Sequence, residues 1–148
     1  MAQLSGKVLK TVLICSFFLT GISGCKDDYT SVVPYVTVNM NFSPTNYIEF
    51  NTPGGSVYFG NAGFGGIIVV NNWGDEAAPF LSFDAACTHE VSSTCKVTTD
   101  GSGIAECPCC GSQYMLFGGN GSVMKGPAIE PLKQYRTSYT GGRIIVRN

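Results

Sequence analysis

Residues 107–114 read Cys-Pro-Cys-Cys-Gly-Ser-Gln-Tyr, which places Cys107, Cys109 and Cys110 within four positions. Three cysteines this close together could serve a metal site, a disulfide, or both. An earlier Cys87-Thr88-His89 supplies a second short pair of ligand types. Two such pairs can converge on one metal centre, because each short spacing lets a turn present both side chains to the same point. The spacing alone leaves zinc and an iron–sulfur cluster equally open.

The overall composition describes one β-rich domain. A chain of 148 residues can bury its own core, and 44% hydrophobic residues argue against disorder. Its 19 glycines and 13% charged residues indicate many strands and tight turns. The net charge of −1 comes without any basic run, so we expect no nucleic-acid partner.

The first residues have the pattern of a secretory signal. Lys7 and Lys10 precede an apolar run, residues 12–19, that is too short to span a bilayer. We therefore expect the chain to be exported and this segment to be removed.

Residues 22–25 read Ile-Ser-Gly-Cys and resemble a bacterial lipobox, although an ordinary signal with a chance cysteine is the alternative. The resemblance implies a signal peptide over residues 1–24, and a lipidated Cys25 with its linker over residues 25–31. The following Lys-Asp-Asp, residues 26–28, resembles a cell-surface export tag or is a solvated linker. We expect an exported lipoprotein at the outer membrane, on its periplasmic or cell-surface face, because several acyl chains anchor firmly.

Strand-like segments separated by glycine turns fill the rest of the chain. Residues 67–70, Ile-Ile-Val-Val, suit a strand that is buried on both faces. Thr140-Gly141-Gly142 indicates a tight β-hairpin turn. We expect one all-β domain over residues 32–148. Its strands are expected at residues 32–38, 47–50, 57–59, 67–70, 80–83, 133–139 and 143–146.

The order of these motifs resembles the Rieske iron–sulfur family. Cys87-Thr88-His89 is followed by the cysteine stretch at 107–114, a glycine-rich turn, and Gly126-Pro127-Ala128. The resemblance covers about residues 80–135 in continuous order. It implies a Rieske-like antiparallel β-sandwich or barrel with a two-loop cluster-binding subdomain, and a [2Fe–2S] cluster as cofactor.

The resemblance also assigns the cluster ligands. Cys87, His89 and Cys107 match family ligands, whereas the position of the family's second histidine holds Cys110. His89 is the single histidine of the chain, so an ordinary two-histidine centre is impossible. A third thiolate adds negative charge to the oxidised centre, and we therefore expect a lower reduction potential.

A disulfide between the two ligand loops is a further implication of the resemblance. The family's pair corresponds to Cys95 and Cys109. Cys95 stands six residues after His89, which is further than the usual family spacing. This departure concerns the shape of the first loop rather than the pairing.

Residues that would contact the cluster or its ligands also carry over from the family. Ser112 and Tyr114 match residues whose hydroxyl groups donate hydrogen bonds to cluster sulfurs and raise the potential. Gly126 and Pro127 match the segment that covers the cluster. The plainer alternatives are a core aromatic for Tyr114 and a simple turn for Gly126-Pro127.

We expect a membrane-tethered single-electron carrier with an unidentified redox protein partner, rather than a catalyst with its own substrate. Two alternatives stay open. Exported cysteines are usually oxidised, so the fold could be a cluster-less, disulfide-braced surface module in which Cys110 pairs with Cys87. The same four side chains, Cys87, His89, Cys107 and Cys110, could instead hold a structural zinc ion.

Overall fold

The computed structural model describes residues 30–148. The expected signal peptide, residues 1–24, lies outside the described residues, and so does Cys25 with most of its linker. No helix in the described part of the chain is long and apolar enough to cross a membrane.

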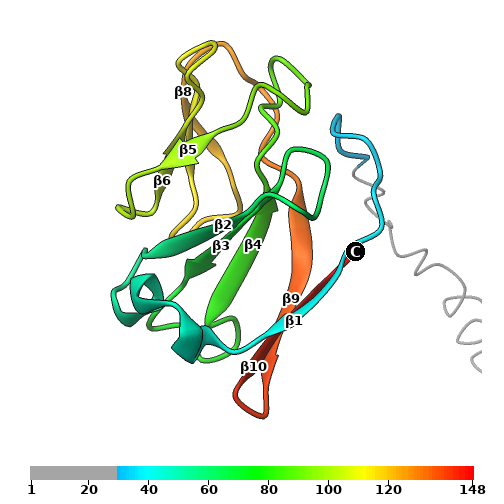
Figure 1. The fold of residues 1–148 in the computed structure, drawn as a ribbon. Coiled ribbons are helices and arrows are strands. Elements are labelled where there is room, and N and C mark those ends of the chain that lie inside the picture. The colour runs from blue at the N-terminus through cyan, green and yellow to red at the C-terminus, as the bar shows by residue number, and fades with distance from the viewer. Residues whose placement is uncertain (1–29) are drawn as a thin grey trace, which may run out of the picture.

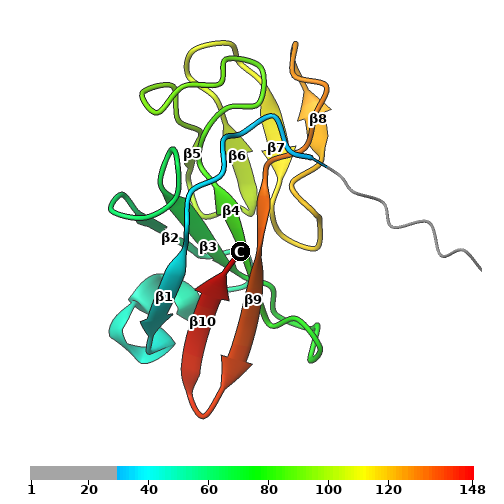
Figure 2. The ribbon, with the colours of Figure 1, turned by 90° about the vertical axis from the view of Figure 1, so that its right-hand side faces the viewer.

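Two antiparallel sheets make up the described fold (Figure 1). The larger sheet has the order β1-β10-β9-β4-β3-β2, and the smaller sheet, β5-β6-β7-β8, lies at one end of it (Figure 2). The expected all-β antiparallel fold is confirmed. The elements are β1 (Asn39–Phe42), η1 (Pro44–Asn46), η2 (Ile48–Asn51), β2 (Ser56–Phe59), β3 (Ile67–Asn71), β4 (Phe80–Asp84), β5 (Thr98–Thr99), β6 (Ile104–Glu106), β7 (Gln113–Met115), β8 (Val123–Lys125), β9 (Gln134–Thr140) and β10 (Arg143–Arg147).

Strand β3 separates two hydrophobic cores. All five of its residues are buried, because its alternating side chains are covered on both faces. Ile67 and Val69 pack in a core between the strands of the large sheet, and Ile68 and Val70 pack in the core that contains the cysteine loops. Each buried aliphatic side chain contributes roughly 1.5–3 kcal/mol. The strand therefore joins the large sheet to the cysteine loops through its own packing.

A buried carboxylate ends β4, at the point where the chain enters the first cysteine loop. Asp84 accepts hydrogen bonds from Phe64 N at 2.7 Å, Gly65 N at 2.9 Å, Ala86 N at 2.9 Å and the Tyr135 hydroxyl at 2.7 Å. Four donors suit an ionised carboxyl group, which can only accept. Burial and the bond to Asp84 raise the pKa of Tyr135. The carboxylate thus ties the glycine loop and β9 to the start of the cysteine loop.

The expected first strand, residues 32–38, is wrong. This segment is not a strand, and the ladder begins at β1 with Asn39 pairing to Arg147. Pro34 has no N–H to give a ladder, and Val38 N donates to the side chain of Asn148 at 3.1 Å instead. Val33 and Val38 are nevertheless buried, because the segment lies along the domain as an extended strap.

The expected strand at residues 47–50 is also wrong. Residues Ile48–Asn51 form the 3-10 helix η2, whose buried residue is Phe50. The Tyr47 ring meets the Phe42 ring edge-on at 5.6 Å between centroids. The side chains of Tyr47 and Phe50 pack against the end of the sheet. This packing favours a tight turn over an extended strand and overrides the β propensity of the segment.

The remaining expected strands are present, and the small sheet is additional. Strands β9 and β10 form the expected hairpin, in which Gly141 and Gly142 have φ of 59° and 73°. Both angles lie in the left-handed region that glycine adopts without strain. Strands of the small sheet have only two or three residues each, too few to produce a periodic pattern.

Replacement of Gly65 by alanine is expected to destabilise the protein by about 1–3 kcal/mol. An added Cβ would lie 2.5 Å from Ala86 N and 2.8 Å from Ala86 Cα, and these backbone atoms cannot move without disturbing Asp84. The measurement is the free energy of unfolding from urea denaturation. The matched control is Gly60→Ala, whose Cβ would meet only the Tyr58 side chain at 3.2 Å. Equal effects of both substitutions would contradict the close approach.

Candidate metal centre

The first cysteine loop leaves β4 and returns to β5. Cys87 N donates to Cys95 O at 3.1 Å, and Val97 N donates to Ala85 O at 2.7 Å. These bonds close the base of the loop, and the intervening residues 88–94 lie beyond it. The long spacing between His89 and Cys95 is therefore accommodated without opening the base.

The second cysteine loop is the turn between β6 and β7. Cys107 N donates to Ser112 O at 2.8 Å, and Gly111 N donates to Cys107 O at 2.8 Å. Gly111 has φ of 74°, which a residue with a side chain rarely adopts. The turn therefore closes on itself and points its cysteines toward the first loop.

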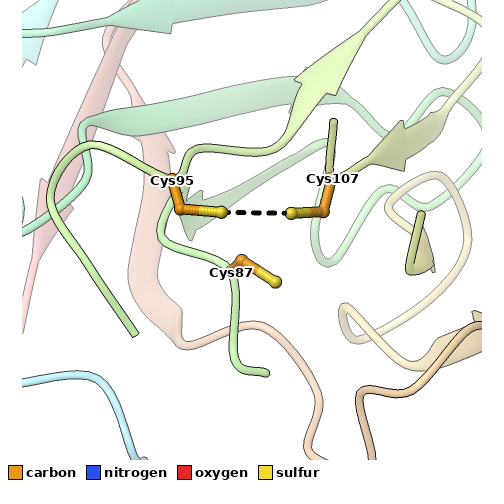
Figure 3. A group of neighbouring side chains, drawn as sticks. All are labelled: Cys87, Cys95 and Cys107. Atoms are coloured by element: carbon orange, nitrogen blue, oxygen red, sulfur yellow. Dashed lines mark hydrogen bonds between the residues drawn. The ribbon is translucent and has the colours of Figure 1, made fainter. Parts of the chain in front are cut away.

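Sulfur atoms from the two loops meet in the core (Figure 3). The Sγ atoms of Cys87, Cys95 and Cys107 all lie within 4.8 Å of one another, and the three side chains are buried. Cys95 is bonded to Cys109, the pair that the family resemblance implies. Cys110, which is half-buried, places its sulfur 3.5 Å from that of Cys87. Three free thiols thus surround a covalent link between the loops.

His89 stands apart from this sulfur group. Its side chain is exposed, and among the described residues it does not join the ligand atoms that lie within 4.8 Å of one another. The structure therefore gathers three of the expected ligands, Cys87, Cys107 and Cys110, and leaves the histidine at the surface. A two-metal centre can divide its ligands between the two ions. The four expected ligands therefore need not converge on a single ion.

The two buried thiols differ in acidity. Burial alone would raise the pKa of Cys87, but the N–H groups of Glu90 and His89 and the Tyr114 hydroxyl stabilise its thiolate and lower the pKa below 9.0. Burial raises the pKa of Cys107 to about 12. At neutral pH the site therefore favours deprotonation at Cys87 first. Metal binding must supply the free energy to deprotonate Cys107.

Tyr114 forms a hydrogen-bond network over Cys87. Its hydroxyl oxygen lies 3.4 Å from Cys87 Sγ and 3.0 Å from Thr88 Oγ1, and it accepts from Thr88 N at 3.3 Å. Thr88 Oγ1 donates to Glu130 O at 2.6 Å. The Tyr114 proton is therefore shared between the threonine oxygen and the cysteine sulfur. A thiolate draws that proton toward sulfur, because charged acceptors form the stronger bond.

Ser112 connects the second loop to the proline segment. Its hydroxyl accepts from Ala128 N at 3.1 Å and lies 3.1 Å from Cys110 Sγ, so its proton can be donated to that sulfur. Gly126 packs against Ser112, and an added Cβ would lie 2.4 Å from Ser112 Cα. Pro127 is exposed on the outer side of the segment. The expected cover over the site is thus built on a glycine contact.

Two residues of the site escaped the sequence analysis. Asp84 fixes the entry to the first loop, and its signal was a single acid at the end of an apolar strand. Thr88 lies between the expected ligands and links Tyr114 to the proline segment. Polar residues that are fully hydrogen-bonded and buried have no distinctive spacing, which is why neither one was found.

The donor set suits a thiophilic metal. Buried sulfurs with one lowered thiol pKa match zinc or iron–sulfur binding, whereas magnesium and calcium require oxygen ligands. The hydroxyl groups of Tyr114 and Ser112 contact the sulfurs of Cys87 and Cys110, respectively. Both hydroxyls would stabilise charge that accumulates on sulfur.

No protein-family model matches the chain. The cytochrome b6-f complex iron-sulfur subunit of Chlorobaculum tepidum is 36% identical over 81 residues, which is 54% of this chain. The match spans 39% of the length of that curated relative.

Solved structures give a broader match. The plasma membrane Rieske protein PetC3 from Synechocystis PCC 6803 is 29% identical, with a TM-score of 0.54 over 77% of this chain and 100% of that chain. A complex of oxygenase and ferredoxin in carbazole 1,9a-dioxygenase has a TM-score of 0.53 over 74% of this chain and 93% of that chain. Its 20% identity makes that likeness one of fold alone.

Replacement of Tyr114 by phenylalanine is expected to raise the pKa of Cys87 in metal-free protein, because one hydrogen bond to the thiolate is lost. Thiolate forms as pH rises through the pKa, so its 240 nm absorbance should appear at higher pH in the variant. Cys87→Ser identifies the step that belongs to this thiol. Tyr139→Phe, a change on the exposed part of β9, should leave it unmoved. An unshifted step in Tyr114→Phe would contradict the assigned bond.

Proposed function

Because the chain is similar in sequence and fold to Rieske proteins, we propose that this protein holds a [2Fe–2S] cluster and passes single electrons between redox partners. One observation supports this proposal most directly. Buried sulfurs of Cys87 and Cys107 come together from two loops, and the Cys95–Cys109 disulfide joins those loops. Such an arrangement presents two thiolates to one metal without exposing them to water.

Four side chains would hold the cluster: Cys87, His89, Cys107 and Cys110. When bound, the cluster supplies one-electron oxidation and reduction. The chain's own residues exclude water, orient the sulfurs and donate hydrogen bonds to them. Tyr114 acts on Cys87, and Ser112 acts on Cys110. Electron transfer needs no substrate pocket. A second iron site with two histidines would need further histidines, and His89, the single histidine of the chain, is already assigned to the cluster.

The third thiolate sets the direction of the potential. An additional anionic ligand disfavours the gain of an electron, so this centre should have a lower potential than a two-histidine centre. The Ser112 hydroxyl opposes the effect, since hydrogen bonds to sulfur stabilise the reduced form. The charge of the third thiolate has the larger effect on the reduction potential, because one hydrogen bond only partly neutralises a thiolate.

The proposal includes a membrane tether at Cys25 after removal of residues 1–24. The strap, residues 32–38, bears on this tether because the chain joins the domain there. Lys133 Nζ donates to Pro34 O at 3.0 Å, and Val33 is buried, so the tether would run from Cys25 to about Val33. A segment of eight residues spans at most about 28 Å. The domain would therefore stay close to the membrane surface, at the outer membrane on its periplasmic or cell-surface side.

A second candidate function has its own observation. The existing Cys95–Cys109 disulfide and the 3.5 Å approach of Cys87 to Cys110 would suit a cluster-less module braced by two disulfides. A structural zinc ion on the same four side chains is a third possibility. The three differ in iron content and in the number of free thiols.

Protein isolated from the envelope of its own host and reduced with dithionite is expected to contain about two irons and two sulfides per chain. Electron paramagnetic resonance should show a rhombic reduced-cluster signal. Isolation from the envelope excludes artificial loading by cytoplasmic overexpression. Colourless, iron-free protein would overturn the electron-carrier proposal, and stoichiometric zinc would replace it with the structural metal site.

Replacement of Cys110 by histidine is expected to keep the cluster and raise its potential by on the order of 100 mV, because a neutral ligand replaces an anionic one. Replacement of Cys107 by serine should abolish the cluster. Redox titration of the visible absorbance measures both. A Cys110→His potential equal to that of the unaltered protein would show that Cys110 is not a ligand. A retained signal in Cys107→Ser would remove the whole assignment.

A further inference from the structure

The sulfurs of Cys87 and Cys110 lie in direct contact although the residues are 23 positions apart. Their Sγ atoms are separated by 3.5 Å, and both thiols are free. A disulfide bond measures about 2.05 Å, so a shift of about 1.5 Å would join them. The Cys95–Cys109 disulfide already holds the two loops together, which lowers the loop-closure entropy that a second bond must overcome.

Burial gives the two thiols different roles. Cys110 is half-buried and can be reached from solvent, whereas Cys87 is fully buried behind it. An oxidant would therefore meet Cys110 first, and Cys87 lies next to it as the resolving thiol. Cys107 is also buried, and its sulfur lies 3.4 Å from that of Cys95, which is already bonded to Cys109, and within 4.8 Å of that of Cys87.

We infer that Cys87 and Cys110 form a reversible disulfide in the cluster-free protein, and that this bond closes the metal site. The inference rests on the proposed cluster function in one respect: the bond removes two of the four ligands. Cluster loading is then possible only for protein in which this pair is reduced. The lock arises from the cysteine that stands where the resembling family has a histidine, so it belongs to this chain rather than to the fold.

The chemistry needs a disulfide as oxidant, and oxidised glutathione is the probe. Cys110 sulfur attacks one glutathione sulfur, which forms a mixed disulfide and releases one glutathione thiol. Cys87 sulfur then attacks Cys110 sulfur, the mixed bond breaks, and the second glutathione thiol leaves. Two protein thiols lose two electrons and two protons, and one oxidised glutathione becomes two thiols.

Glutamate positions allow the bond to be mapped in the full chain. Cleavage after glutamate releases residues 77–90 with Cys87 alone, residues 91–106 with Cys95 alone, and residues 107–148 with the other three cysteines, because the bond between Glu130 and Pro131 resists cleavage. Cluster-free protein treated with oxidised glutathione is alkylated and digested without reductant. We expect all three peptides in one linked species for the unaltered protein and for Cys107→Ser.

The matched variant is Cys110→Ser, in which we expect residues 91–106 and 107–148 to stay linked while 77–90 is released and alkylated. In Cys110→Ser, a disulfide that links the peptide of residues 77–90 to the other peptides should form at least tenfold more slowly than in Cys107→Ser. Equal rates in the two variants would overturn the inference, because they would assign Cys107 as the partner. Unlinked 77–90 in oxidised Cys107→Ser would overturn it as well.

Iron and sulfide uptake tests the closing of the site. Glutathione-oxidised protein is expected to take up at least tenfold less iron and sulfide than the reduced protein, and Cys110→His should load equally in both states. Equal loading of oxidised and reduced unaltered protein would overturn the lock. A mapped Cys87–Cys110 bond in protein that never loads would support the disulfide and reject the cluster function, so the two failures are distinguishable.

Discussion

The Asp84 carboxylate is the interaction on which the cysteine site depends. It is buried at the end of β4 and takes hydrogen bonds from the glycine loop, from Tyr135 on β9 and from Ala86 beside Cys87. A buried charge without these donors would be very unfavourable, so the four partners cannot separate independently. The position of the first loop relative to the large sheet follows from this constraint.

The second loop is positioned through the first. The Cys95–Cys109 disulfide and the contact between Cys95 and Cys107 bring the β6–β7 turn against the first loop. Tyr114 then covers Cys87, and Ser112 covers Cys110 while it binds the proline segment. Two of the sulfurs that would be ligands, those of Cys87 and Cys110, are therefore each held by a hydroxyl before any metal is bound. This preformed geometry also brings Cys87 and Cys110 close enough for the competing disulfide.

Much of the fold could be predicted because its strands are continuous apolar runs or are bounded by glycine turns. The run at 67–70 indicated a strand buried on both faces, and Gly141-Gly142 indicated the hairpin. The strap at residues 32–38 and the helix η2 were mistaken for strands, since both contain residues that strands favour. Tertiary packing decided them: the strap bonds to the side chain of Asn148, and Phe50 turns inward.

The sequence alone determined the chemistry available to this protein: the ligand types, the absence of a second histidine, and the third cysteine in its place. These are properties of residue identity and short spacing, which no packing can change. Only the tertiary structure decided which sulfurs touch and which groups hold them. The 3.5 Å contact between Cys87 and Cys110 joins residues far apart in the chain, and so does the hydrogen bond from Tyr135 to Asp84. The exposure of His89 likewise depends on how its loop packs. Such distances follow from how loops pack on a curled sheet, and local sequence patterns do not specify them.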